Sequence, residues 1–340
     1  MTRLSELGEF GLISRLTAGI KYGAGVIKGV GDDAAVLDYG DRWILFTTDA
    51  AVEDVHFRLG QVAPEDVGYK ALAVNISDIA AMGGRPLYAV VAAGLPDYFS
   101  LEEAAALYEG LREAAQKYGV SLVGGDTTTA PVLFISIALL GESAPGCARY
   151  RSGAKAGDII CTTGSLGGGA AGLFLLANEG VPCPEPLRSF LLRKYKRPEP
   201  RVEAGLTLSS IPAVHALIDV SDGLASELHH IADESGCGCR LFRAAVPVEP
   251  AAELVGRRAG IDPVEWALFG GDDYELVFTV APEAMGEVNE ALSSVGSSCR
   301  PVGIVVREKG VWLVHQDGST SDLPPAGYEH FVTGRSPVNR

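Results

Sequence analysis

Apolar runs rich in β-branched residues recur along the chain and alternate with segments of helical periodicity. The runs predict strands at residues 43–50, 87–95, 133–141, 158–164, 274–280 and 310–315. No run approaches the roughly 20 apolar residues that a membrane helix needs. No fixed repeat period is visible, so the pattern predicts a mixed α+β or α/β protein rather than a repeat protein.

Start and stop signals predict three helices, at residues 64–83, 100–119 and 222–236. Pro64 stands at a first helical position, and two acidic residues follow it in the first turn. Ser100 and Glu103 have the spacing of a capping box. The third helix places apolar side chains on one face and is expected to stop at Gly236.

The pattern changes at residues 142–157, where apolar periodicity stops and glycine, proline and basic residues cluster. A chain of 340 residues fits about two domains of ordinary size. We therefore expect one domain at 1–145 and a second at 150–330. The polar residues 331–340 are expected to form a frayed tail.

Composition and charge narrow the classes of function. Hydrophobic residues make up 47% and charged residues 21%, which argues against extended disorder. The 43 acidic against 28 basic residues give a net charge of −15, so nucleic acid is not an expected partner. The beginning of the chain lacks the features of a secretory signal, and a membrane location is not expected either. These features predict a soluble, cytoplasmic protein.

The six cysteines form no CxxC pair and no Cys/His ligand spacing, so a structural zinc site is not expected. Reduced thiols fit the expected compartment. His56 follows Asp49 by seven residues, so both a shared site and a structural role stay open. His229 and His230 lie on a predicted helix, where we expect them to be structural.

The context of the aspartates is more informative than their number. Most have glycine, serine or threonine beside them and an apolar segment on one or both sides, as in GVGDDAAVL (Asp32, Asp33), FTTDA (Asp49), NISDIAAMGG (Asp78), VGGDTTT (Asp126), IDVSDGL (Asp219, Asp222) and FGGDDYEL (Asp272, Asp273). Such residues also suit turns and helix caps. That reading suffices for one Gly-Asp, but six such segments favour a site in which carboxylates gather.

Carboxylates that gather at buried strand ends raise each other's pKa unless cations neutralise them. Oxygen ligands without a cluster of histidine or cysteine suit Mg²⁺ rather than zinc or copper. Mg²⁺ takes one or two carboxylates and completes its shell with water and substrate phosphates. The sequence therefore predicts several Mg²⁺ sites and a polyphosphate ligand.

Two glycine-rich segments match dinucleotide-binding patterns only superficially. In residues 29–34, two carboxylates in the turn would repel a pyrophosphate. Residues 167–172 follow a predicted strand and open a helix, but the basic region about 20 residues later offers no acid for a ribose. Close helix packing and anion binding at this helix N-terminus both stay open. P-loop, HRD, DFG, GxSxG and HExxH motifs do not occur.

The chain contains, in this order, the motifs GEFGLI, GVGDDAAVL, TTDAAVEDVHF, YKALAVNISDIAAMG, GGDTT, RSGAKAGD, DVSDGL and GGDDYELVFT. This order of motifs, from Gly8 to about Phe331, resembles the thiamine-monophosphate kinases. GDD, SD-AAMG and GGD are shared by a superfamily that includes aminoimidazole ribonucleotide synthetase, selenophosphate synthetase and the hydrogenase-maturation dehydratase. VHF, RSGAK, DVSDGL and GGDDYEL are more specific to the thiamine-phosphate branch.

The resemblance implies a homodimer whose N-terminal sheets pair, with a C-terminal α/β domain over the site. It implies Mg²⁺ ligands at Asp33, Thr47, Thr48, Asp49, Asp78, Asp126, Asp219 and Asp222. It implies ATP contacts at Tyr108, Gly125, Asp126, Arg151 and Ser221, and thiamine-phosphate contacts at His56, Asp272 and Tyr328. Asp49, Asp78, Asp126 and Arg151 would be catalytic. Position 272 is commonly Glu in the family, and Thr129 stands where Arg is frequent.

The implied reaction moves the γ-phosphoryl group of ATP directly onto the phosphate of thiamine phosphate, giving ADP and thiamine diphosphate. The acceptor oxygen is already anionic, so the chemistry needs metal ligands more than a general base. Alternatives are another ATP-using enzyme of the superfamily and a non-catalytic nucleotide-binding dimer. The number of Mg²⁺ ions, the kinetic order and the use of free thiamine stay open.

Overall fold

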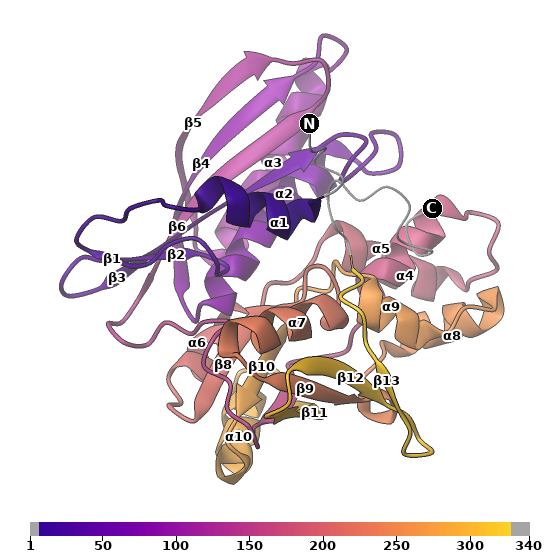
Figure 1. Cartoon of the computed structure of the whole chain (residues 1–340). Helices are drawn as coiled ribbons and strands as arrows, with labels where there is room; N and C mark the ends of the chain where they lie inside the picture. Colours follow the sequence, from indigo (N-terminus) through magenta and orange to yellow (C-terminus); the bar gives the residue numbers. More distant parts are fainter. Residues whose placement is uncertain (1–6, 328–340) are drawn as a thin grey trace.

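The computed structural model describes residues 7–327 and shows two mixed sheets with helices packed against them (Figure 1). The first part of the chain contains α1 (Gly8–Thr17), β1 (Val26–Lys28), β2 (Ala35–Asp38), β3 (Trp43–Val52), α2 (Pro64–Ala81), β4 (Arg85–Leu95), α3 (Leu101–Tyr118), β5 (Ser121–Thr129) and β6 (Phe134–Ser143). These strands form one sheet in the order β1-β2-β3-β6-β4-β5, in which only β4 and β5 pair in parallel.

The second part forms β7 (Ile159–Thr162), α4 (Gly168–Ala177), α5 (Glu185–Lys196), α6 (Val202–Ser209), β8 (Val214–Asp219), α7 (Leu224–Ser235), β9 (Gly238–Phe242), η2 (Arg243–Ala245), α8 (Pro250–Ala259), α9 (Pro263–Phe269), β10 (Leu276–Val280), η3 (Pro282–Ala284), α10 (Met285–Ser294), β11 (Arg300–Val306), β12 (Gly310–Val314) and β13 (Thr320–Asp322). Its sheet has the order β13-β12-β9-β11-β7-β10-β8, with β9 and β12 parallel. The predicted mixture of α and β structure is confirmed.

The predicted helices and strands are present, with small differences at their ends. The capping box of Ser100 and Glu103 opens α3, and Gly236 ends α7 in the left-handed conformation. Pro64 begins α2 without a side-chain cap. All six predicted strands occur as β3, β4, β6, β7, β10 and β12. Within residues 7–327, no helix combines the length and apolar character that crossing a bilayer requires.

The first sheet is covered on one face and open on the other. Leu45, Val91 and Ile137 point to the face on which α2 packs and are buried. The strand alternation sends their neighbours Phe46 and Val90 to the opposite face, where both are exposed. The second sheet differs, because α7 lies on one face and α6 with α10 on the other.

The segment between β6 and β7 passes from the first sheet to the second. Arg149 N–H donates to the carbonyl of Met82 just after α2, and the carbonyl of Tyr150 accepts from Leu217 N–H in β8. The predicted domain boundaries at residues 145 and 150 fall in this segment and stay a prediction. The segment places Arg151 between the two sheets.

Candidate active site

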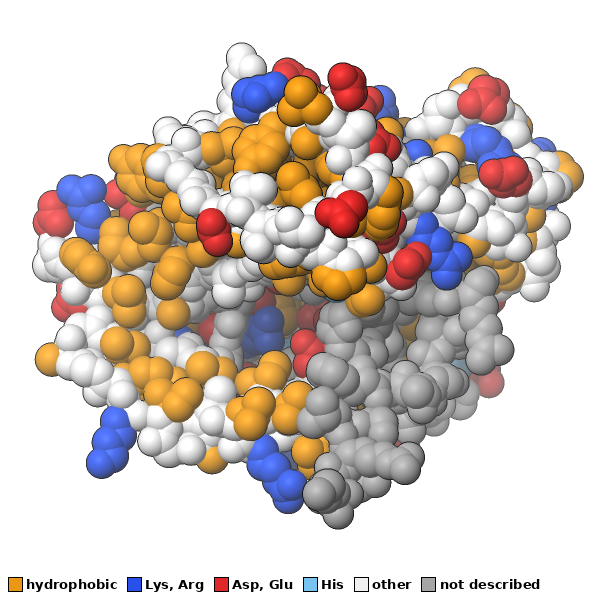
Figure 2. All heavy atoms as spheres, turned by 90° about the horizontal axis from the view of Figure 1, so that it is seen from above, with side chains coloured by type: hydrophobic (Ala, Val, Ile, Leu, Met, Phe, Trp, Pro, Cys, Tyr) orange, Lys and Arg blue, Asp and Glu red, His pale blue; other side chains and the backbone are white. Residues whose placement is uncertain are grey.

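A cavity of about 540 Å³ brings together loops and helices from both sheets. Its walls include side chains of α2, the end of β3, the loop after β8 and the loop before β10. Seven residues predicted from the sequence line it: Asp49, His56, Asp78, Asp219, Ser221, Asp222 and Asp272. Figure 2 shows the molecule from above, with acidic and basic side chains in a hollow near the middle of the view.

Helix α2 holds Asp49 of β3 in place. Alternation along β3 turns Thr47 and Asp49 toward the helix, where the Thr47 hydroxyl donates to Asp78 at 2.6 Å. The backbone N–H of Asp49 donates to the Asn75 side-chain oxygen at 3.1 Å. Asn75 is buried and donates its own amide to the helix carbonyl of Ala71. These bonds fix Asp49 and Asp78 side by side.

The same helix reaches the second sheet. Ser77, next to Asp78, donates from its hydroxyl to the carboxylate of Asp219 at 2.6 Å. Asp219 ends β8 and is buried. Three residues later, the N–H of Asp222 donates to the side chain of the buried Glu227 at 3.0 Å. Carboxylates from two sheets therefore meet around one end of α2.

Asp33 joins the cluster together with Arg151. The Arg151 Nε donates to Asp33 at 3.1 Å, and its backbone N–H donates to Asp32 at 3.1 Å. Lys28 pairs with the other oxygen of Asp32 at 3.3 Å. In the described part of the chain, the second oxygen of Asp33 is buried without a hydrogen-bond partner. An unpartnered buried carboxylate oxygen is a place where a cation would be stabilising.

Burial raises the pKa values of the clustered carboxyl groups. Burial and then the charge of Asp33 raise the pKa of Asp219 to about 8. Burial, followed by the charges of Glu9 and Asp272, raises the pKa of Asp222 to about 7. The pKa of Asp78 is raised well above its usual value, by burial and then by its carboxylate neighbours. The cluster is thus poorly able to hold its negative charge unaided.

The carboxylate and hydroxyl oxygens of the cluster fit Mg²⁺ that brings part of its own coordination shell. Among residues 7–327, no three acidic, histidine or cysteine side chains already form a metal cage. Mg²⁺ does not need one, because it binds one or two carboxylates and fills its shell with water and phosphate oxygens. The oxygen-only cluster with its orphaned Asp33 oxygen therefore suits ions that arrive with a polyphosphate.

Four predicted residues lie away from this cluster. The side chain of Thr48 points to the open face of the first sheet, 3.5 Å from the Ser136 hydroxyl. Tyr108 and Gly125 line a separate groove of about 760 Å³ between α3 and β5. Asp126 is exposed on β5, at the edge of the sheet. In the described chain, the structure does not bring these four residues to Asp49.

A close backbone approach explains the glycine at 125. A Cβ there would lie 2.0 Å from the carbonyl oxygen of Val91 on β4. Register aligns Asp49, Ile137, Val91 and Gly125 in one row across the sheet. Three strand spacings of about 4.8 Å separate the ends of this row by roughly 14 Å.

The loop before β10 positions Asp272. Asp272 and Tyr274 have φ values of 59° and 51°, which are uncommon for residues with side chains. Backbone bonds from Asp272 to Ser221 and from Tyr274 to Val220 hold this conformation. The Tyr274 hydroxyl donates to Asp272 at 3.0 Å, and the ammonium of Lys70 pairs with the same carboxylate at 2.8 Å.

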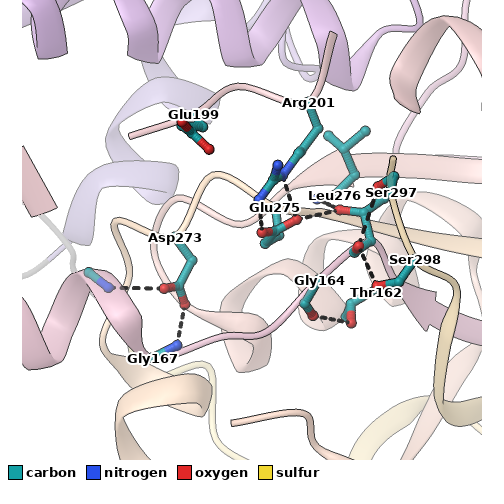
Figure 3. A network of polar contacts seen from close by, with 12 residues as sticks. Thr162, Gly164, Gly167, Glu199, Arg201, Asp273, Glu275, Leu276, Ser297 and Ser298 are labelled. Atoms are coloured by element: carbon teal, nitrogen blue, oxygen red, sulfur yellow. Dashed lines mark hydrogen bonds and ion pairs between the residues drawn. The ribbon is translucent and has the colours of Figure 1, made fainter. Parts of the chain in front are cut away.

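The neighbouring Asp273 settles the role of the glycine-rich segment at 167–172. Its carboxylate accepts from the N–H groups of Gly167 and Gly169 at 2.6 and 3.1 Å (Figure 3). The anion at this helix N-terminus is therefore supplied by the chain itself. Close packing is also present, since a Cβ on Gly172 would lie 2.2 Å from the Leu191 carbonyl.

A buried ion pair anchors the start of β10. Glu275 accepts from the guanidinium of Arg201, as Figure 3 shows, and also from the hydroxyl of Thr163. Arg201 immediately precedes α6, which packs against α2. The loop that carries Asp272 is thus tied to the helix that carries Asp78.

His56 lies in the cavity wall, where its Nδ1 accepts from the backbone N–H of Val52 at 3.0 Å. The backbone carbonyl of His56 accepts from the hydroxyl of Tyr195 at 3.2 Å. The remaining predicted substrate contact, Tyr328, lies outside the described residues.

Sequence reasoning missed several residues that build the site. Lys70, Asn75, Ser77 and Glu227 contribute contacts described above. The helical spacing of Lys70, Val74 and Asp78 at i, i+4 and i+8 was the available signal, since all three line the cavity. This spacing identifies site residues only when it is known which face of the helix meets the other sheet.

Comparison with known proteins identifies the class to which this architecture belongs. Residues 31–143 match the family "AIR synthase related protein, N-terminal domain" and residues 155–316 match its C-terminal domain. The two sheets with the carboxylate cluster between them are thus those of an AIR synthase-related protein. Within that class, the chain belongs to the thiamine-monophosphate kinase family.

Relatives of the whole chain carry this assignment. Thiamine-monophosphate kinase of Bacillus subtilis (strain 168) is 40% identical over 96% of this chain and all of its own length. The Escherichia coli (strain K12) enzyme is 37% identical over 96% of this chain and 99% of its own. A solved complex of AaThiL with AMPPCP and TMP superposes with a TM-score of 0.85 at 32% identity, covering 97% of this chain and 99% of that chain.

Proposed function

We propose that this protein transfers the γ-phosphoryl group of ATP to thiamine phosphate, producing ADP and thiamine diphosphate for thiamine diphosphate biosynthesis. The observation that carries the proposal is the single cavity in which Asp49, Asp78 and Asp219 meet Asp272. The relatives are thiamine-monophosphate kinases, and one was solved with AMPPCP and TMP bound. The carboxylate cluster suits an anionic donor, ATP, that arrives with Mg²⁺. The end of the cavity that contains Asp272 suits an acceptor with a cationic ring.

We assign the metal ligands to the clustered oxygens. Asp33, Thr47, Asp49, Asp78, Asp219 and Asp222 would hold Mg²⁺, with Thr48 and Asp126 as further predicted ligands. When bound, Mg²⁺ offsets the repulsion between the phosphates of donor and acceptor. Arg151 is already partly neutralised by Asp33, so its contact with ATP would compete with that pair.

Direct in-line transfer fits the side chains of the cavity. The acceptor oxygen of thiamine phosphate is anionic and needs no residue to remove its proton. Catalysis by this chain then consists of binding and aligning two phosphate groups. A phospho-aspartate trapped during turnover would contradict direct transfer.

We further propose a homodimer that pairs the open faces of the first sheet. Phe46, Tyr88 and Val90 are exposed apolar side chains on or beside this face. Figure 2 shows hydrophobic side chains gathered over much of the surface seen from above. Asp126 also lies on the open face, because it is in register with Ala92 and Ser136 rather than with Val91. A second subunit would bring Asp126, Tyr108 and Gly125 near a partner's cavity.

A cytoplasmic location completes the proposal. All six cysteines are free thiols, as a reducing compartment would maintain them. The relatives' substrates, a nucleotide and a vitamin phosphate, are in keeping with that compartment.

The decisive experiment incubates purified protein with ATP, MgCl₂ and thiamine phosphate and measures thiamine diphosphate and ADP by chromatography. We expect the two products in equal amounts. A nucleotide-binding dimer without activity would release no ADP. An enzyme of another branch would consume ATP only with a different acceptor, such as a ribonucleotide amide or selenide. Either result would overturn the proposal.

A further inference from the structure

An ion pair occupies the acceptor end of the cavity. The ammonium of Lys70 lies 2.8 Å from the carboxylate of Asp272, and the two side chains are 19% and 25% exposed. The ammonium also lies 3.8 Å from the ring centre of Tyr195, which is itself buried. The Tyr274 hydroxyl donates to the same carboxylate at 3.0 Å. The Asp272 carboxylate therefore already has a cationic partner and a hydrogen-bond donor.

Lys70 stands out among the basic residues that line the cavity. Arg58 is 68% exposed at its side chain and reaches Asp54 only at 4.0 Å. Lys196 lies at the end of α5. Lys70 projects from the middle of the cavity wall on α2 and is mostly enclosed. It is the well-placed cation for an anionic group inside the cavity.

We propose that Lys70 binds the phosphate of the acceptor, and that the Lys70–Asp272 pair opens when thiamine phosphate enters. This inference rests on the proposed function. The acceptor carries a cationic thiazolium and an anionic phosphate, which are the two charges of the ion pair in reverse. Asp272 contacts the thiazolium and Lys70 contacts the phosphate, so one internal pair is exchanged for two pairs with the ligand.

The backbone decides which partner moves. Asp272 has a left-handed backbone conformation that is held by its bond to Ser221 and by close contact with Gly169. Lys70 carries its ammonium on a flexible stem of four methylene groups, and the cation–π contact with the Tyr195 ring does not depend on Asp272. The lysine can therefore swing to the phosphate while Asp272 stays in place.

Helix geometry puts this phosphate on the acceptor side. Lys70 and Asp78 are eight residues apart, so their Cα atoms lie about 12 Å apart along the axis. Helical side chains tilt toward the N-terminus, which directs Lys70 away from the carboxylate cluster. Asp272 lies close enough to Asp222 for its charge to act there. A phosphate at Lys70 thus adjoins the cluster without being part of the donor.

Charge exchange makes the phosphate necessary for binding. A ligand with both charges leaves no residue of the pair unpartnered. Free thiamine carries only the cationic ring. When it binds, either Lys70 loses its carboxylate partner, or Asp272 has to pair with two cations at once. An uncompensated charge in a partly enclosed site is costly. The pair therefore selects phosphorylated thiamine over thiamine.

The test compares affinities for thiamine phosphate and for free thiamine by calorimetry, with MgCl₂ and a non-hydrolysable ATP analogue present. For Lys70→Met we expect at least a tenfold weaker affinity for thiamine phosphate and an unchanged or tighter affinity for thiamine, because no lysine then competes for Asp272. Lys70→Arg keeps the charge and should recover most of the lost affinity. Lys309→Met, at an exposed position, is the matched control.

Kinetics add an independent readout. In Lys70→Met, KM for thiamine phosphate should rise by about tenfold or more while KM for ATP stays within about twofold. Lys70→Gln is a second charge-free variant, to be used if the methionine variant unfolds. Equal losses for both thiamine ligands, a loss confined to ATP, or wild-type affinities throughout would each overturn the inference. Absence of turnover in the wild type would instead overturn the proposed function, because the binding comparison needs no turnover.

Discussion

At the scale of single residues, Asp78 shows how the site is prepared for a cation. It accepts the hydroxyl of Thr47, and burial with its neighbours Asp49 and Asp219 raises its pKa well above the usual value. The fold itself supplies the Arg151 guanidinium to Asp33, at the far side of the cluster. A divalent ion would relieve this repulsion directly.

The first prediction follows from this repulsion. Asp78→Asn should lower kcat by at least about 10²-fold, since it removes a metal oxygen that acts on the transferred group. The thermal midpoint without Mg²⁺ should stay the same or rise, because one buried charge is gone. Turnover assays and thermal unfolding measure the two effects. Asp317→Asn, an exposed acid, is the control. Normal turnover at saturating Mg²⁺ would remove Asp78 from the metal site.

The second prediction concerns pH. Asp219 and Asp222 have pKa values of about 8 and about 7 in the folded chain, above those of an unfolded chain. The folded state therefore binds more protons between about pH 4 and pH 8, and the free energy of unfolding without metal falls as pH rises through this window. Mg²⁺ bound by these carboxylates would compete with the protons.

The rise in melting temperature caused by saturating MgCl₂ should consequently be larger at about pH 8 than at about pH 6. Differential scanning fluorimetry at both values measures it. The Asp219→Asn variant should flatten the difference. A Mg²⁺ effect that is the same at both pH values would argue against protonation of the cluster.

The sequence alone predicted some of the residues of the site and missed others. The small polar or glycine neighbours and apolar flanks of the aspartates predicted that Asp49, Asp78 and Asp219 gather, and they share the cavity. The period of two along β3 could also have separated Thr47 from Thr48, because neighbours in a strand face opposite sides. Lys70 escaped notice, since its partner Asp272 lies in another part of the chain.

At the scale of elements, the start of α4 supports the loop that carries Asp272. Asp273 accepts from two N–H groups of this helix start, and its own pKa is raised to about 7 by burial. A Cβ on Gly169 would lie 2.3 Å from the carbonyl oxygen of Asp272. The glycines therefore permit an approach that positions the acceptor loop.

The third prediction uses two adjacent glycines. Gly169→Ala must displace the backbone of Asp272, so KM for thiamine phosphate should rise by about tenfold or more while KM for ATP changes little. Gly168→Ala, whose Cβ would meet side chains only at 3.5 Å and beyond, should behave like the wild type. Steady-state kinetics compares them. Equal behaviour of the two variants would show that the close approach is not needed.

Elements with local signals were predicted well. Helices α2, α3 and α7 have a proline start, a capping box or a glycine stop within their own sequence. Strand β5 was not predicted, because SLVGGDTTT is polar and glycine-rich and depends on pairing with β4. Its exposed edge also explains why sequence alone could not separate Asp126 from the buried cluster.

At the scale of the whole molecule, one face of the first sheet is open, and three predicted ATP-binding residues lie outside the cavity. Tyr108, Gly125 and Asp126 lie on or beside the edge of the sheet, away from Asp49. An exposed apolar sheet face is typical of a surface that another protein covers. Pairing two copies would both cover this face and complete the cavity.

The fourth prediction tests that pairing. Val90→Arg places a charge on the open face and should convert a dimer to a monomer in size-exclusion chromatography with light scattering. Turnover should fall by at least about 10²-fold if the partner supplies ligands. Val295→Arg, at a similarly exposed valine after α10, should keep both the size and the activity. A monomeric wild type would rule out the dimer.

Helix α2 keeps two residues of the cavity at a fixed spacing when the two sheets move relative to each other. Lys70 and Asp78 belong to the same uninterrupted helix. A movement of the two sheets relative to each other would therefore change the cavity entrance without changing the distance between Lys70 and Asp78. If Lys70 binds the acceptor and Asp78 the metal of the donor, the helix fixes the spacing between the two substrates. Deleting a single residue between these positions would turn one of them by about 100° around the helix axis and abolish activity even though Lys70 and Asp78 themselves were retained.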